Sequence, residues 1–169
     1  VNEFSSFARM PSPILKRQNI NLIMKRAVDF MKLSLKNEIT FINHSDRFYV
    51  NVDEDQFYRV FINLIKNSEE SLNEKKEKEA NFKGKIDIEI RRNNDYIEVI
   101  LKDNGIGITD AKKVMTPYFT TKKTGTGLGL PIVNKIINEH SGDFSIVNKK
   151  NNGIEIFITL PTHPWKEKF

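Results

Sequence analysis

Apolar residues recur with helical spacing in three stretches of the chain, at 20–35, 53–72 and 127–140. The middle stretch has the clearest pattern, because one of its faces is apolar along the whole length. That face consists of Phe57, Val60, Phe61, Leu64, Ile65, Ser68 and Leu72. Asp53 can cap this helix, and Gln56 stands three residues later, as in a capping box. The pattern predicts three amphipathic helices, the second of which begins after Asp53.

Alternation of apolar and polar residues predicts strands between these helices. It is clearest at 86–90, where isoleucines alternate with charged residues, and at 96–102. Further strands are expected at 39–43, 47–52, 143–147 and 154–160, the last two forming a hairpin. Residues 74–83 are charge-rich, which is typical of a solvated loop or a frayed helix end. The order of elements predicts an α/β two-layer sandwich with helices on one face of a mixed sheet.

Length and composition limit the number of domains and the kinds of site that this chain can have. The 169 residues suit one domain, and the absence of cysteine excludes disulfides and thiolate metal sites. The net charge of +5 indicates either a solvated surface rich in Lys and Asn or an anionic partner. No segment approaches about 18 consecutive apolar residues, so we expect no membrane insertion by this chain. It begins with Val1 rather than Met, and we expect it to be part of a longer protein.

Two glycine clusters indicate a polyphosphate site. The first follows Asp103 as Asn-Gly-Ile-Gly, and the second reads Thr124, Gly125, Thr126, Gly127, Leu128, Gly129. Bare backbone can present its N–H groups to phosphate oxygens, and the second cluster also begins a helix, where anions are favoured. The spacing of the second cluster matches neither the dinucleotide-binding motif nor the P-loop motif, which argues against those folds. We expect the long loop at 109–124 to be mobile without nucleotide and to form a lid.

Asp103 ends a predicted strand directly before two glycines. An Asp in this position can simply form a turn. As a buried carboxylate it could instead accept a hydrogen bond from the exocyclic amine of adenine. Guanine has a carbonyl there and would be rejected, because buried acceptors would face each other. Ile106 or Ile108 could form an apolar wall for the base.

Asn63 and Asn67 are four residues apart and therefore share one face of the predicted second helix. Asparagine is unfavourable inside a helix, so the pair indicates side-chain hydrogen bonds or ligation of a hard cation such as Mg²⁺. Lys66 lies beside them, and Lys122 precedes the second glycine cluster. Both lysines could meet phosphate charge or could simply be solvated. The three histidines have no matching acids at metal spacing, and we expect structural or surface roles for them.

These motifs, in this order, resemble the catalytic and ATP-binding domain of sensor histidine kinases, which has the Bergerat fold shared with DNA gyrase and the Hsp90 chaperones. Residues 55–72 resemble its N box, 103–107 its G1 box, 117–122 its F box and 125–129 its G2 box. The opening residues resemble the end of the dimerisation helix in nitrogen-regulation sensors of the NtrY type. The resemblance covers about residues 14–161, and four ordered motifs are more specific than any one of them.

The resemblance implies a mixed sheet of about five strands covered on one face by about three helices. It implies ATP and Mg²⁺ as cofactors and transfer of the γ-phosphate to a histidine on a dimerisation domain, for relay to a response-regulator Asp. Residues 1–13 would be the stub of the dimerisation helix, 14–162 the catalytic domain and 163–169 a tail. The parent would be an inner-membrane sensor with this domain in the cytoplasm. A nucleic acid is not expected as a partner.

The resemblance also implies residue roles. Asn67 would hold Mg²⁺ with the help of Asn63, and Lys66 and Lys122 would meet phosphates. Asp103 would read adenine beside Gly105, Gly107 and Ile108. Residues of the second cluster would wrap the phosphates, namely Thr124, Gly125, Thr126, Gly127, Leu128 and Gly129.

Three departures from the family pattern matter. Asn63 replaces the Glu that activates water in ATP-hydrolysing relatives, so we expect slow hydrolysis. Ile154 replaces a Thr that supports the adenine-reading Asp in many members. The phosphoacceptor motif, His-Glu followed by Asn-Pro, is absent from this sequence, so we expect no autophosphorylation by this chain alone. A nucleotide-binding switch without phosphotransfer, a nucleic-acid binder and another ATPase of the same fold are the alternatives.

Overall fold

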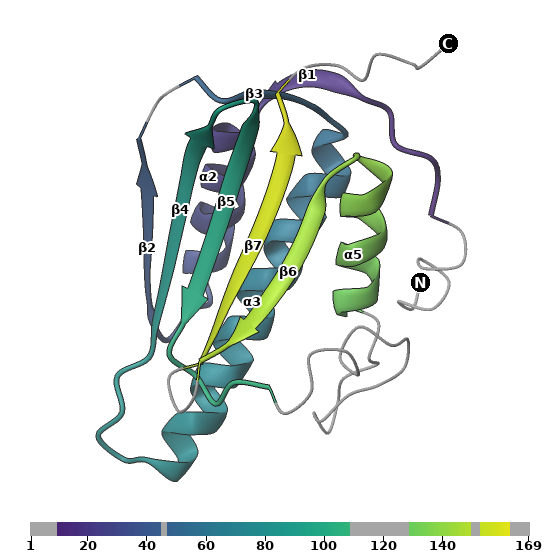
Figure 1. Ribbon diagram of the computed structural model, residues 1–169. Helices are drawn as coiled ribbons and strands as arrows, with labels where there is room; N and C mark the ends of the chain where they lie inside the picture. Colours follow the sequence, from purple (N-terminus) through teal and green to yellow (C-terminus); the bar gives the residue numbers. More distant parts are fainter. Residues whose placement is uncertain (1–9, 45–46, 109–128, 150–152, 163–169) are drawn as a thin grey trace.

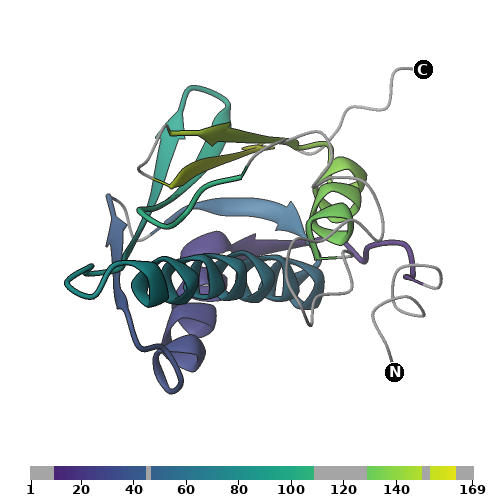
Figure 2. The ribbon, with the colours of Figure 1, turned by 90° about the horizontal axis from the view of Figure 1, so that it is seen from below.

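The computed structural model describes residues 10–44, 47–108, 129–149 and 153–162. A five-stranded sheet forms one layer and three helices form the other, all on the same face (Figures 1 and 2). The strands follow the order β2 (Glu38–Asn43), β4 (Lys85–Asn93), β5 (Tyr96–Asp103), β7 (Ile154–Pro161) and β6 (Asp143–Asn148). Only β2 and β4 run parallel among these neighbouring pairs, so the sheet is mixed. The predicted two-layer sandwich is confirmed.

The helices are α2 (Ile20–Lys32), α3 (Glu54–Lys78) and α5 (Gly129–Glu139). Helix α3 contacts both of the others, and its whole predicted apolar face is buried. It runs to Lys78, so the first part of the predicted linker at 74–83 is helical. Lysine and glutamate are good helix formers, and this explains the extension. None of the helices in the described ranges has the length and apolar content needed to cross a bilayer.

A two-stranded antiparallel sheet, β1 (Lys16–Asn19) with β3 (Tyr49–Val52), lies beside the main sheet. Strand β1 was not predicted, because Lys-Arg-Gln-Asn carries no apolar alternation. In its partner strand β3, Val50 and Val52 are buried, and β1 is extended because its backbone pairs with β3.

The start of α3 is held by contacts that are distant in sequence. The Asp53 side chain caps the helix as predicted, accepting the Gln56 N–H at 3.1 Å. The other half of the predicted capping box is wrong. The Gln56 side-chain amide donates to the carbonyl of Pro11 at 3.0 Å, and the Asp53 N–H donates to Nε2 of His140 at 3.0 Å. The chain before β1 and the end of α5 therefore both meet at this cap.

His140 is a buried structural residue that connects α5 to α3. Its Nδ1 lies 2.7 Å from the carbonyl oxygen of Ile136, which can only accept, so Nδ1 carries the proton. Nε2 is then free of a proton and accepts the Asp53 N–H. The ring packs edge-on against Phe57, with centroids 4.7 Å apart. This arrangement requires the neutral imidazole.

Acidification should therefore destabilise the fold through His140. Burial lowers the pKa of His140 below its ordinary value of 6.5. The hydrogen bond to the Ile136 carbonyl and the negative charges of Asp53 and Glu139 oppose this only in part. The unfolded chain then binds the proton more readily, so the stabilisation is present above pH 6.5 and is lost as the pH falls below it. Urea unfolding at pH 7.5 and 5.5 should show this loss in the wild type and a smaller loss in His140→Gln. Equal losses in the two proteins would contradict the assignment.

Candidate functional site

Asp103 stands at the last position of β5 and faces the helices. Strand alternation puts Ile97, Val99 and Leu101 on the buried face, and Asp103 continues that series. Only 5% of Asp103 is exposed. Its Oδ2 accepts the Ser68 hydroxyl of α3 at 2.7 Å, and its Oδ1 accepts the N–H of Gly105 at 3.0 Å. A buried carboxylate is thus held by one donor from the helix and one from its own loop.

The glycines after Asp103 are needed for close contacts. A Cβ on Gly105 would lie 2.2 Å from the Ser71 hydroxyl oxygen, which accepts the N–H of the following residue at 3.0 Å. Gly107 has a φ of +77°, and a Cβ there would lie 2.5 Å from Oδ1 of Asn148. The same Asn148 oxygen accepts the N–H of Ile108 at 3.2 Å. Polar side chains from α3 and β6 therefore hold the loop in place.

Asn104 ties this loop to the segment before β4. Its side-chain oxygen accepts the N–H of Lys85 at 2.8 Å, and its side-chain amide donates to the carbonyl of Lys83 at 3.0 Å. Its own carbonyl accepts from the Lys75 ammonium of α3 at 3.2 Å. The first glycine cluster is thus anchored to α3 and to the start of β4.

The polar stripe of α3 reaches the start of α5. Asn63 and Asn67 are half-buried, whereas Lys66 is exposed. A Cβ on Gly129 would lie 3.7 Å from Nδ2 of Asn67, so the first residue of α5 adjoins that side chain. The amino end of a helix carries unpaired N–H groups and partial positive charge. Asn67 and Asp103 belong to one region, because Ser68, which holds Asp103, is the next residue along α3.

Part of the predicted site lies outside the described residues. These positions are Lys122, Thr124, Gly125, Thr126, Gly127 and Leu128, together with the expected lid at 109–124. The structure places Gly105 beside Asp103 and Gly129 beside Asn67, and α3 links the two pairs through Ser68.

Four residues that hold the site were not predicted as site residues: Ser68, Ser71, Asn104 and Asn148. Ser68 was assigned to the apolar face of α3, since a small side chain on that face looks like a packing residue. Ser71 lies four residues after Asn67, so helical spacing could have placed it on the same face. Nothing in the sequence near Asn148 pointed to the loop, because that contact joins distant elements.

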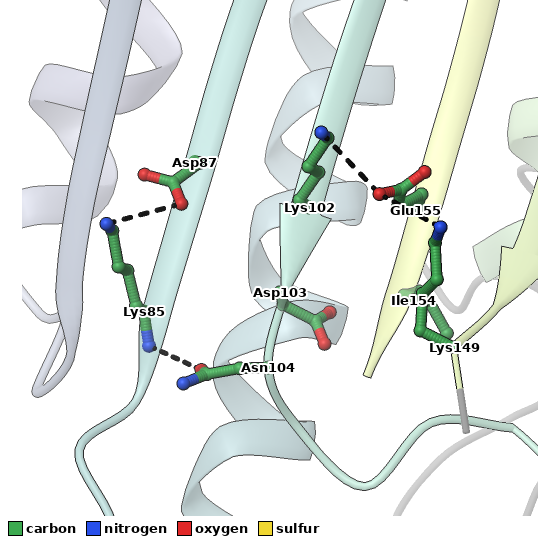
Figure 3. Close-up of a pocket in the computed structure, with 8 residues that line it drawn as sticks. All are labelled: Lys85, Asp87, Lys102, Asp103, Asn104, Lys149, Ile154 and Glu155. Carbon is green, nitrogen blue, oxygen red and sulfur yellow. Dashed lines mark hydrogen bonds and ion pairs between the residues drawn. The ribbon is translucent and has the colours of Figure 1, made fainter. Parts of the chain in front are cut away.

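A charged hollow of about 320 Å³ lies on the other face of the sheet (Figure 3). Its charged side chains alternate with buried ones, which places them on the solvent side. Lys102 and Lys149 lie 3.5 Å and 3.6 Å from Glu155, and Lys85 lies 3.5 Å from Asp87. Exposed ion pairs of this kind contribute little to stability. Asp103 also lines this hollow, although its carboxylate is bonded to Ser68 of α3 on the helix side.

Comparison with known proteins decides the family. Residues 52–164 match the family described as histidine kinase-, DNA gyrase B- and HSP90-like ATPases. The chain belongs to this family. The match contains α3, the Asp103 loop, α5 and the β6–β7 hairpin, which are the elements that build the site.

Sensor histidine kinases are among the similar sequences. The NtrY-like sensor histidine kinase of Rickettsia prowazekii (strain Madrid E) is 35% identical over 161 residues, which cover 94% of this chain and 26% of that protein. The nitrogen regulation protein NtrY of Azorhizobium caulinodans is 30% identical over 163 residues, covering 95% of this chain and 21% of that protein. The chain thus spans about a quarter of the length of these relatives.

Solved structures agree with this family. The nucleotide-free catalytic domain of histidine kinase ThkA has a TM-score of 0.76 at 26% identity, covering 88% of this chain and 96% of that one. Full-length ShkA in complex with AMPPNP has a TM-score of 0.79 at 18% identity, covering 97% of this chain and 36% of that one, and shows the fold alone. The predicted Bergerat fold is confirmed, and the chain is an ATP-binding catalytic domain of the histidine kinase family.

Proposed function

We propose that this domain holds ATP with the adenine at Asp103 and the phosphates between Asn67 and the start of α5. It then transfers the γ-phosphoryl group to a histidine on the dimerisation domain of the same parent protein. The observation that carries the proposal is the buried Asp103 carboxylate, bonded to Ser68 one residue along α3 from Asn67. A base-reading group and a phosphate-facing group are thereby supported by the same helix.

Each residue has a role that suits its chemistry. Asp103 accepts a hydrogen bond from the exocyclic amine, and Gly105, Gly107 and Ile108 shape the loop beside the base. The Asn67 carboxamide, half-buried next to Gly129, fits Mg²⁺, because hard cations prefer oxygen ligands. When bound, Mg²⁺ neutralises charge on the phosphates.

The remaining residues act on the phosphates. Asn63 assists Asn67 from one turn earlier on α3, and the exposed Lys66 meets phosphate charge. Lys122 and the cluster at 124–129 complete the phosphate contacts. Phosphoryl transfer leaves the protein little covalent work, so positioning and charge neutralisation supply most of the rate.

Asn63 favours transfer over hydrolysis. A carboxamide cannot take a proton from water, so no general base stands at this position of α3. An acceptor imidazole brings its own nucleophilic nitrogen. The γ-phosphorus then gains a bond to that nitrogen and loses its bond to the leaving ADP.

The proposal extends to the parent protein. Residues 1–13 would end its dimerisation helix, 14–162 form the catalytic domain and 163–169 a tail. A response regulator would receive the phosphate, and the parent would be an inner-membrane sensor that keeps this domain in the cytoplasm.

Phosphotransfer can be tested directly. The chain is mixed with a separately made dimerisation domain of its parent and with ATP labelled at the γ-phosphate. Acid-labile phosphohistidine on the acceptor is expected, and its appearance should depend on both proteins. Bound ATP without phosphohistidine would support a nucleotide-binding switch instead. Steady ATP turnover by the chain alone would indicate an ATPase.

Asn67→Ala should remove the Mg²⁺-dependent part of ATP affinity. Losing the carboxamide oxygen should weaken binding in Mg²⁺ by more than about tenfold, or about 1.4 kcal/mol. Calorimetric titration with ATP, with and without a chelator, measures this component. Asn138→Ala replaces an exposed asparagine on α5 and should bind like the wild type. A chelator effect of wild-type size in Asn67→Ala would rule out the metal role.

A further inference from the structure

The carboxylate of Asp103 is fixed from two directions. Ser68 donates to Oδ2 at 2.7 Å from α3, and the Gly105 N–H donates to Oδ1 at 3.0 Å from the loop. Both side chains are buried, Asp103 with 5% and Ser68 with 1% exposed. Because both oxygens are bonded to donors on separate elements, the carboxylate cannot rotate without breaking one of these bonds.

The residue of β7 opposite Asp103 is apolar and cannot donate a hydrogen bond through its side chain. Ile154 of β7 lies directly opposite Asp103 in the antiparallel pair, and its side chain is a hydrocarbon (Figure 3). Gly153, the residue before it, packs so tightly that a Cβ there would lie 2.5 Å from Oδ1 of Asp103. The hydroxyl that orients Oδ2 therefore comes from the helix layer beneath the sheet.

We propose that Ser68 is a positioning residue for base selection, an inference that rests on the proposed reading of adenine by Asp103. The Ser68 hydroxyl has one proton, which it donates to the Asp103 carboxylate in a hydrogen bond. The oxygen atoms of both side chains can then only accept hydrogen bonds from a ligand. A purine with a 6-amino group can donate to such a pair. A purine with a 6-oxo group would bring another acceptor and leave buried groups unpaired.

The test compares nucleotides that differ at the 6-position. Dissociation constants for ATP and for inosine triphosphate, both with Mg²⁺, are measured for the wild type, Ser68→Ala, Ile154→Thr and the double variant. A hydrogen bond to a charged group corresponds to about a tenfold effect or more. Ser68→Ala should weaken ATP binding about tenfold and inosine triphosphate binding less than about twofold. The ratio of the two constants should therefore fall.

The double variant tests whether a hydroxyl beside Asp103 causes the preference for ATP over inosine triphosphate. A threonine at 154 stands next to Asp103 across the strand pair, within the spacing at which cross-strand side chains interact. Ser68→Ala with Ile154→Thr should recover most of the lost preference for ATP. A double variant that discriminates no better than Ser68→Ala would overturn the proposal.

Ser71→Ala is the matched control. Ser71 lies three residues later on α3 and bonds the loop at the Ile106 N–H, not the carboxylate. It should weaken both nucleotides alike and leave their ratio unchanged. If Ser68→Ala also weakens both alike, or changes neither, Ser68 does not act in base selection. Unchanged ATP binding in Asp103→Asn would instead refute the proposed function itself.

Discussion

Asp103→Asn should lower the affinity for ATP by about a hundredfold and abolish the preference for ATP over GTP. A hydrogen bond to a charged acceptor is worth about 1.5–3 kcal/mol, or about 10- to 150-fold. Asparagine keeps the size of the side chain and one oxygen that can accept the Gly105 N–H. Its amide would meet the Ser68 hydroxyl, which can accept as well as donate. The fold should therefore persist, while the carboxylate oxygen that accepts from the base is replaced by an amide that donates.

Calorimetry with ATP and GTP measures both effects in one set of titrations. Asp95→Asn makes the same chemical change at the β4–β5 turn, at the other end of β5 from Asp103, and should bind like the wild type. Thermal unfolding of both variants shows whether the fold is kept. If Asp103→Asn binds ATP as tightly as the wild type and still prefers it to GTP, Asp103 does not read the base.

Gly153→Ala should destabilise the domain by more than about 2 kcal/mol and impair nucleotide binding at the same time. Gly153 has a φ of +78°, a conformation that costs an L-residue roughly 1–2 kcal/mol. The added Cβ would also lie 2.0 Å from the backbone carbonyl oxygen of Asp103. Backbone in a paired strand cannot move aside cheaply, so β5 and β7 would have to separate at this end. That movement would displace the Asp103 carboxylate.

Gly129→Ala provides the comparison. A Cβ on Gly129 makes an ordinary contact at 3.7 Å, and alanine favours the helix that begins there. Its free energy of unfolding should stay within about 0.5 kcal/mol of the wild type. Urea unfolding of both variants checks the difference. A Gly153→Ala protein as stable as the wild type would mean that the contact with Asp103 is looser than the geometry indicates.

Asp103 could be placed from sequence because its position follows from a simple rule. Alternate residues of a strand face the same side, so a strand with Ile97, Val99 and Leu101 inside also turns Asp103 inward. The apolar face of α3 was predicted for the same reason, from a period that local backbone geometry imposes. These patterns need no knowledge of the tertiary structure.

The supporting residues were not predictable in this way. Ser68 looks like a packing residue until β5 is placed over α3, and His140 meets the Asp53 N–H only because α5 ends beside the start of α3. Strand β1 carries no apolar signal, and its structure comes from pairing with β3. Each of these features depends on contacts between distant segments. Local periodicity cannot supply them.

The most direct test of the central claim is titration of the folded chain with ATP and Mg²⁺. Calorimetry measures the heat of binding, and thermal unfolding measures the change in the unfolding midpoint. The account predicts one saturable site and a rise in the unfolding midpoint. At a ligand concentration of about 100 times the dissociation constant, the stabilisation should be about 2.7 kcal/mol. A folded chain that gives no binding heat and no shift in its midpoint at millimolar ATP would contradict the account.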